Sequence, residues 1–111
     1  MEDLVLLLRA MADENRFRIL KLLLTHDLCV GALASRIGIT RAAVSQHLQI
    51  LRRAGLVRGE KRGYWTHYAV QRKVLKQMGG GLSEMSDHGL IPEGICMKTL
   101  PMAASVIKER R

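Results

Sequence analysis

The spacing of apolar residues changes at Gly55, and this change constrains the fold more than any other feature of the sequence. Before it, residues 41–54 place apolar side chains at the three- and four-residue intervals of a helix face. After it, residues 56–60 and 64–70 follow the two-residue period of strands, and residues 61–63 fit the turn of a hairpin. We therefore expect a mainly α-helical chain that carries one β-hairpin.

Two short helices meet around Gly38. The first is expected at residues 30–37 and ends at this glycine, as helices commonly do. Thr40 is a favourable N-cap for the second, at residues 41–54. The buried stripe of that second helix is expected to consist of Val44, Leu48 and Leu51. Because a glycine lets two helices cross closely, the pattern predicts a helix-turn-helix, with the hairpin as its wing.

Three more helices are expected around this unit. Residues 2–11 form an apolar helix with little to cover it, which suggests an interface element. A second helix begins near Asp13. Its buried stripe is expected to include Phe17, Leu20 and Leu24, widened by Ile19 and Leu23. The last begins near Gln71, and residues 79–81, three glycines, are expected to kink, break or end it, because each costs a helix about 1 kcal/mol relative to alanine.

The length of 111 residues suits one domain, and 48% of the residues are apolar, enough for one modest core. We assign residues 1–86 to a single winged helix-turn-helix domain and residues 87–111 to a C-terminal tail. The tail is expected to form a short helix at residues 102–108 and to contribute to an effector site. Some packing is expected from Met85, Leu90 and Ile91.

Positive charge is concentrated on the second helix of the helix-turn-helix. The chain has 18 Lys and Arg against 10 Asp and Glu, a formal net charge of +8, yet no acid occurs from Gly38 to Gly59. A merely solvated helix face usually alternates in sign. Phosphates repel carboxylates, whereas Ser, Gln and Arg bond to phosphates and base edges, so we expect this face to bind DNA. The predicted DNA-binding residues are Thr40, Arg41, Ser45, Gln46, His47, Gln49, Arg52, Arg53, Lys61 and Arg62.

The hairpin is expected to supply a basic wing. Glu60 is its one acid, and Gly63 permits a tight turn. Such a tip can grip the DNA backbone beside the major groove. Three aromatic side chains, those of Tyr64, Trp65 and Tyr68, are expected to pack in the core and hinge rather than to stack on bases.

The N-terminal apolar run, Leu4 to Leu8, is too short to span a bilayer, which needs roughly 20 apolar residues. Glu2 precedes it where a signal peptide would be basic. We expect a cytoplasmic protein without a membrane partner, whose two cysteines, Cys29 and Cys96, are thiols in the resting state.

Several of these stretches resemble the ArsR/SmtB winged-helix regulators, and the resemblance covers about residues 4–78. The matching stretches are residues 13–20 (DENRFRIL), 27–34 (DLCVGALA), 44–48 (VSQHL), 54–57 (AGLV) and 63–68 (GYWTHY). The resemblance implies a homodimer through the first and fifth helices, with both recognition helices in successive major grooves of a two-fold symmetric operator. Half-sites of such dimers lie about 34–36 Å apart. It also implies repression that an effector relieves.

The sequence departs from the family pattern at the effector site. Metalloid-sensing members have Cys-Val-Cys at the start of the third helix, and this chain has Cys29 and Val30 followed by Gly31. One thiolate cannot supply the three that trivalent arsenic prefers. Cys96 is the other thiol, and the pair could bind a soft ion (arsenite, antimonite, Cd or Zn) or form a disulfide or sulfur-bridged link. The two cysteines could also be unrelated and inert.

Two other function classes stand as alternatives. A winged-helix module that binds RNA, nucleic acid without sequence preference, or protein would have no inducer and no preferred operator. An enzyme is the least supported class, since no nucleophile–base pair, carboxylate pair or phosphate-binding glycine motif is evident. We therefore expect an effector-responsive, DNA-binding transcriptional repressor.

Overall fold

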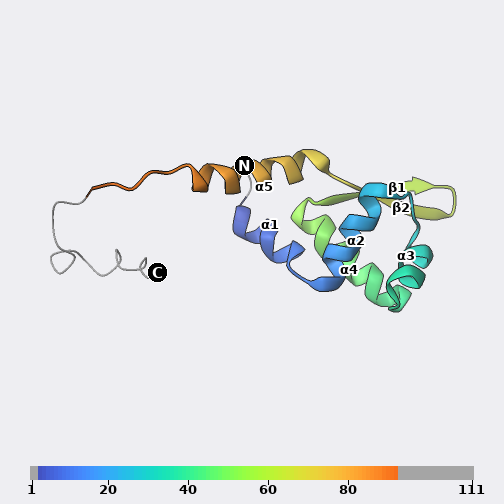
Figure 1. The fold of residues 1–111 in the computed structure, drawn as a ribbon. Helices are drawn as coiled ribbons and strands as arrows, with labels where there is room; N and C mark the ends of the chain where they lie inside the picture. The colour runs from blue at the N-terminus through green and yellow to red at the C-terminus, as the bar shows by residue number, and fades with distance from the viewer. Residues whose placement is uncertain (1–2, 93–111) are drawn as a thin grey trace.

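The fold is described from a computed structural model, which describes residues 3–92. Within that range the elements follow in the order α1 (Leu4–Met11), α2 (Glu14–Thr25), α3 (Val30–Ile37), α4 (Arg41–Ala54), β1 (Val57–Arg62), β2 (Trp65–Val70) and α5 (Arg72–Ser86) (Figure 1). This order confirms the prediction of a mainly α-helical chain with one β-hairpin wing. The predictions for Cys96 and for a helix at residues 102–108 lie outside the described residues.

The helix ends lie where the capping residues predict them. The Asp13 carboxylate accepts hydrogen bonds from the backbone N–H groups of Asn15 and Arg16, each at 3.0 Å, and so caps α2. The Thr40 hydroxyl oxygen accepts from the Ala43 N–H at 3.0 Å and caps α4. Gly38 and Gly55 have φ of 85° and 87°, a left-handed conformation that ends α3 and α4.

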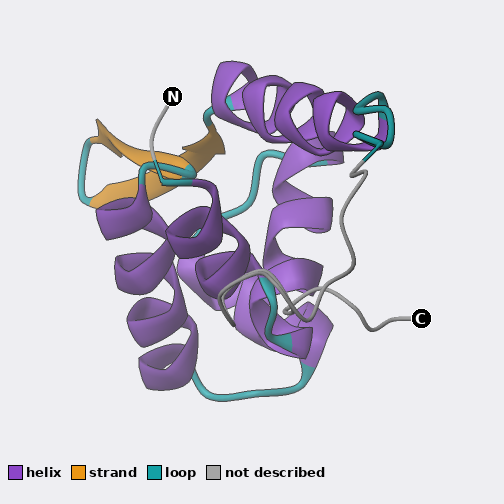
Figure 2. Cartoon of the chain, turned by 90° about the vertical axis from the view of Figure 1, so that its left-hand side faces the viewer, coloured by secondary structure: helices purple, strands orange, loops and turns teal. Residues whose placement is uncertain are grey.

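Helix α4 is the centre of the domain, and α1, α2, α3 and β1 all pack against it. Its predicted stripe of Val44, Leu48 and Leu51 is fully buried. The other side of this core comes from Leu33 of α3 and Leu56 before β1, both 0% exposed. Figure 2 shows the helices packed side by side, with the two-stranded hairpin at their margin. The face of α4 opposite the core therefore stays open.

The buried stripe of α2 agrees with the predicted one except at Phe17. It is made of Ile19, Leu20 and Leu23, whereas Phe17 is 46% exposed. Phe17 lies at the N-terminal end of α2, where it borders an open apolar pocket beside α1 and α5 instead of facing α4. The expectation that Phe17 belongs to the core was wrong.

The hairpin turn is shifted along the chain from the predicted position. Strand pairing runs from Val57 opposite Val70 to Arg62 opposite Trp65, so the turn is residues 63–64. Gly63, with φ of 64°, supplies the positive φ that such a two-residue turn needs. Lys61 and Arg62 are therefore strand residues.

The turn projects beyond the helices, and this leaves two aromatic side chains in water. Tyr64 is 98% exposed and Trp65 is 62% exposed, so the expectation that both pack in the core or hinge was wrong. Tyr68, nearer the base of the hairpin, is partly buried against the core as predicted.

Helix α5 runs without interruption through Gly79, Gly80 and Gly81, which corrects the predicted kink or end. Glycine lowers helix propensity without removing a hydrogen bond, so the flanking turns carry the helix across. The expected packing after the glycines is absent from the described chain: Met85, Leu90 and Ile91 are 62%, 99% and 78% exposed. No helix within residues 3–92 is long and apolar enough to cross a membrane.

Candidate nucleic-acid interface

The open face of α4 is polar and cationic. The side chains of Arg41, Ser45, Gln46, Arg52 and Arg53 are exposed on it, as is Thr40 at the cap, and Gln49 is half-exposed. The Gln49 side-chain oxygen accepts hydrogen bonds from the Arg52 guanidinium at 2.8 and 3.3 Å. The structure thus brings most of the predicted DNA-binding residues onto one surface with both donors and acceptors.

Arg41 lies against the start of α3. A Cβ atom built on Gly31 would lie only 3.1 to 3.3 Å from the Arg41 guanidinium. The guanidinium therefore occupies the space next to position 31, where Cys-Val-Cys sequences carry their second cysteine. The sequence shows that position 31 lacks the second cysteine, but no local pattern predicts that the Arg41 guanidinium lies there instead.

His47 points away from this open face. Its side chain is 20% exposed, and its Nδ1 lies 3.2 Å from Arg16 Nη1 and 4.0 Å from an Asp13 carboxylate oxygen. The Arg16 guanidinium also donates to the Ala10 carbonyl at 2.5 Å. The backbone hydrogen bond from Arg16 is the main cause that lowers the pKa of Asp13. His47 is thereby placed to hold α4 against the α1–α2 corner.

Carboxylates form ion pairs with the two arginines of the wing. Arg62 contacts Asp27 at 2.5 Å and Glu60 at 2.8 Å, and Arg58 contacts Glu60 at 2.9 Å. The hydrogen bond from Arg62 is the main cause that lowers the pKa of both Asp27 and Glu60. The bond to Asp27 in turn raises the pKa of Arg62. Lys61 is the exposed wing cation without an ion pair among the described residues.

The segment before α3 is joined to the wing. Besides its contact with Arg62 on β1, the Asp27 carboxylate lies 2.9 Å from His67 Nδ1 on β2. Two residues on, Cys29 forms an isolated antiparallel β-bridge with His67. Cys29 is also the half-buried N-cap residue of α3. A displacement of Cys29 would therefore act on both α3 and β2.

This ion-pair network was not predicted from the sequence. Arg58, Glu60 and Arg62 alternate along β1 and so share one face of the strand, a local signal that would have revealed their pairing. Asp27 is 35 residues from Arg62, and no local pattern connects them. Within residues 3–92, no group of three or more His, Cys, Asp or Glu side chains is placed to bind a metal ion.

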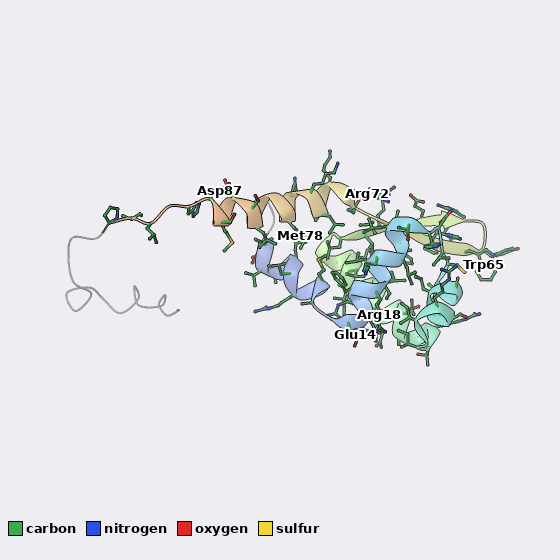
Figure 3. All side chains as sticks on the ribbon, viewed as in Figure 1. Glu14, Arg18, Trp65, Arg72, Met78 and Asp87 are labelled. Atoms are coloured by element: carbon green, nitrogen blue, oxygen red, sulfur yellow. The ribbon has the colours of Figure 1, made fainter. Side chains whose placement is uncertain are left out.

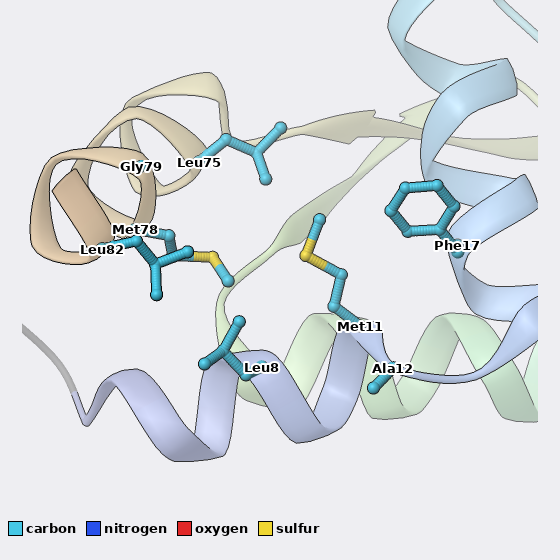
Figure 4. A pocket seen from close by; sticks show the side chains of 8 residues that line it. All are labelled: Leu8, Met11, Ala12, Phe17, Leu75, Met78, Gly79 and Leu82. Carbon is cyan, nitrogen blue, oxygen red and sulfur yellow. The ribbon is translucent and has the colours of Figure 1, made fainter. Parts of the chain in front are cut away.

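A second surface lies at the other end of the domain. Leu8 and Met11 of α1, Phe17 of α2, and Leu75, Met78 and Leu82 of α5 line an open apolar pocket (Figure 4). Val5 and Leu6, also on α1, are 56% and 55% exposed. This surface has the chemistry of a protein contact, whereas that of α4 and the wing suits a polyanion.

A helix-turn-helix with a cationic second helix and a β-hairpin beside it defines a winged helix-turn-helix DNA-binding domain. Residues 13–58 match the family described as "Bacterial regulatory protein, arsR family". The transcriptional activator HlyU of Vibrio cholerae serotype O1 is 45% identical over 74 residues, which are 67% of this chain and 68% of HlyU. The chain belongs to the ArsR family, whose members are DNA-binding transcriptional regulators and not enzymes.

Solved structures agree with this placement. An ArsR-like transcriptional regulator from Rhodococcus sp. RHA1 aligns with a TM-score of 0.69 at 30% identity, over 75% of this chain and 78% of that one. The homodimeric winged helix-turn-helix DNA-binding domain of Mb0332 from Mycobacterium bovis aligns with a TM-score of 0.62 at 26% identity, over 76% and 79% of the two chains. The predicted family and winged helix-turn-helix fold are confirmed.

Proposed function

We propose that the protein is a homodimeric repressor that occupies a two-fold symmetric operator and leaves it when an effector reaches Cys29 and Cys96. The observation that carries DNA binding is the exposed α4 face, which has three arginines and no acid along residues 41–54. In this assignment α4 lies in the major groove, Gln46 and Ser45 meet base edges, and the arginines hold phosphates. His47 acts by positioning α4.

The dimer is proposed through α1 and α5. The apolar pocket between these helices opens to solvent, and Leu82 and Met85 beside it are 45% and 62% exposed. Burying such side chains against a second copy removes apolar surface from water, worth about 25 cal/mol per Å². The homodimeric state of the Mb0332 domain supports a homodimer.

The effector step is proposed to begin at Cys29. Since Cys29 starts α3 and bridges β2, a bond from its sulfur to a soft metal or metalloid ion, or to the Cys96 sulfur, would shift the helix-turn-helix relative to the wing. By linkage, effector and operator then weaken each other's binding by the same factor, typically 1–3 kcal/mol. HlyU is named an activator, so the direction of regulation is part of the proposal.

Selection of bound DNA fragments tests whether the protein recognises a specific operator. Fragments from the source genome that the pure protein retains should share one two-fold symmetric sequence with half-sites about one DNA turn apart. Retention of all fragments alike, with salt-dependent affinity only, would contradict an operator and favour the module without sequence preference.

Titration with candidate effectors tests whether Cys29 and Cys96 are the sensor. Arsenite, Cd, Zn, peroxide and polysulfide are each added to the operator complex of the wild type and of Cys29→Ser and Cys96→Ser. We expect one agent to release the wild type and to leave both variants bound. Release of all three proteins alike would eliminate the thiols as the sensor.

A further inference from the structure

A groove lies between α1 and α4, on a different side of α1 from the apolar pocket. Helical spacing places Leu6, Arg9 and Ala10 together on this side of α1, where they line the groove. Leu8 lies on the other side and lines the apolar pocket with Met78, which Figure 3 shows between α5 and α1. The groove is therefore separate from the dimer contact proposed at that pocket.

The groove has a volume of about 470 Å³, and both apolar and cationic side chains line it. Small-molecule sites in proteins commonly have volumes of about 300–1,000 Å³. The apolar lining includes Leu6, Ile50 and Ala54, and the cations are Arg9, Arg16 and Arg53. Leu6 and Ile50 are 55% and 39% exposed, so aliphatic side chains from two helices face water in the same groove. A ligand with an apolar part would remove both from water.

Two cations of the groove are available to an anion. Within residues 3–92, neither Arg9 nor Arg53 forms an ion pair. Asp13 follows Arg9 by four residues, which is the spacing of an ion pair within a helix. Its carboxylate instead accepts the backbone N–H groups at the start of α2. The positive charge of the groove is therefore left without a matching carboxylate in the described chain.

Arg16 adds a cation whose position is fixed. Its Nε donates to the Ala10 carbonyl oxygen at 2.5 Å, and its Nη1 lies 3.2 Å from His47 Nδ1. Because these contacts orient the guanidinium before a ligand binds, binding costs this side chain little entropy. The groove thus combines one oriented guanidinium with two that have no carboxylate partner among residues 3–92.

The groove borders the face of α4 that is proposed to bind DNA. Arg53 and Ile50 also line an adjoining hollow with Gln46 and Gln49. The Arg53 guanidinium therefore lies next to both the groove and the residues assigned to the operator. An anion bound to Arg53 would compete with a DNA phosphate for the same cation.

We propose that this groove binds an amphipathic anion, an aliphatic carboxylate, with its chain on Leu6 and Ile50 and its carboxylate on the arginines that line the groove. The planar fork of a guanidinium matches the two oxygens of a carboxylate. A bound carboxylate takes Arg53 from DNA, so ligand and operator weaken each other's binding by the same factor. Binding of the ligand needs no DNA, whereas this antagonism rests on the proposed function.

Isothermal titration calorimetry of the full-length protein with decanoate tests the site. We expect one decanoate to bind per protomer, at concentrations below those at which the carboxylate forms micelles. Octanoate and dodecanoate test the apolar contact, since each added methylene should tighten binding by about 4-fold. Decanol keeps the chain without the charge and should bind more weakly than decanoate.

Variants on α1 test the two parts of the groove separately. Arg9→Gln removes a guanidinium and should weaken decanoate binding by up to about 5-fold. Leu6→Ala removes three carbon atoms and should weaken it by up to about 60-fold. Lys73→Gln is the matched control, because it removes one positive charge from an exposed position of α5 outside the groove, and it should bind like the wild type. Since Leu6 and Arg9 are exposed, all variants should melt close to the wild-type temperature.

Fluorescence anisotropy of a labelled operator tests the antagonism. Saturating decanoate should weaken operator binding by the wild type. Arg9→Gln without ligand should bind the operator like the wild type, because Arg9 lies outside the proposed DNA-binding residues, and it should need more decanoate for release. Decanoate that binds the protein and leaves operator affinity unchanged would overturn the antagonism.

The outcomes distinguish this inference from the proposed function. If the wild type selects no operator but binds decanoate more tightly than both α1 variants, the proposed function fails and the site is supported. Absence of decanoate binding, equal binding by the wild type and both variants, or decanol bound as tightly as decanoate would overturn the site. A Leu6→Ala protein that changes its oligomeric state would also overturn it, by assigning the groove to a second copy.

Discussion

Asp27 forms an ion pair with Arg62 of the wing. Replacing Asp27 by asparagine tests whether this pair keeps Arg62 from binding a DNA phosphate. The Asp27→Asn side chain keeps the size of the original but loses the negative charge that holds the Arg62 guanidinium at 2.5 Å. Among residues 3–92, the one remaining carboxylate partner of Arg62 is then Glu60, which also pairs with Arg58. Both partners of the Asp27–Arg62 pair are about half exposed, so a DNA phosphate can compete for the guanidinium.

The size of the effect follows from counting cations. In each Asp27→Asn protomer one guanidinium, that of Arg62, loses its pairing with Asp27 and can bind a phosphate, so a dimer gains two phosphate contacts. Each additional phosphate neutralised steepens the dependence of log affinity on log salt by about 0.9, so the dimer should gain about 1.8 in slope. Since the pKa of Asp27 lies below its ordinary value, the carboxylate is charged at neutral pH and the full effect is expected there.

Fluorescence anisotropy of a labelled operator, from about 50 to 300 mM salt, measures this slope. Asp87→Asn is the matched control, because it removes the same charge from an exposed position after α5, away from the wing. We expect tighter binding at low salt and a steeper slope for Asp27→Asn alone. A slope equal to that of the control, or weaker binding, would show that Asp27 helps DNA binding by fixing the wing and would refute the competition.

Three further predictions concern the helix caps and the sensor position. Thr40→Ala should lower the free energy of unfolding by about 1 kcal/mol in denaturant titrations, and Thr40→Ser should restore it; equal stability of all three proteins would contradict the capping role. The lowered pKa of Asp13 means that its ionised form stabilises the fold at neutral pH and that this contribution disappears as pH falls through the lowered pKa. Asp13→Asn keeps the cap and should flatten that part of the stability–pH curve, and an unchanged curve would refute the assignment. Gly31→Cys should create a Cd-binding thiol pair with Cys29, seen as thiolate–metal absorbance, and weaken operator binding by displacing Arg41; unaltered affinity would show that the position of Arg41 is unimportant.

The sequence predicts the helix-turn-helix well because its boundaries depend on local chemistry. Thr40 caps α4 through its own side chain, and Gly38 and Gly55 end helices through their own backbone freedom. The buried stripe of α4 follows from helical spacing alone. These signals act within one or two turns, and tertiary packing does not override them here.

Features that depend on contacts between residues far apart in the sequence were harder to predict from the sequence. Tyr64 and Trp65 look like buried strand residues until the register of the hairpin places them beyond the helices. The pairing of Asp27 with Arg62 needs the α2–α3 connection to lie beside β1 and β2, which no local pattern states. The orientation of His47 likewise follows from how α4 packs on α2, and a helical wheel places it too close to the boundary to decide.

Competition binding of wild type and Gln46→Ala to the operator and to unrelated DNA tests the central claim most directly. If α4 recognises bases, the wild type should prefer its operator by about 10³-fold or more. The variant should lose roughly 5- to 150-fold of that preference, the cost of one base contact, while its affinity for unrelated DNA stays the same. Equal preference in both proteins would contradict the assignment of α4 as the element that reads the operator.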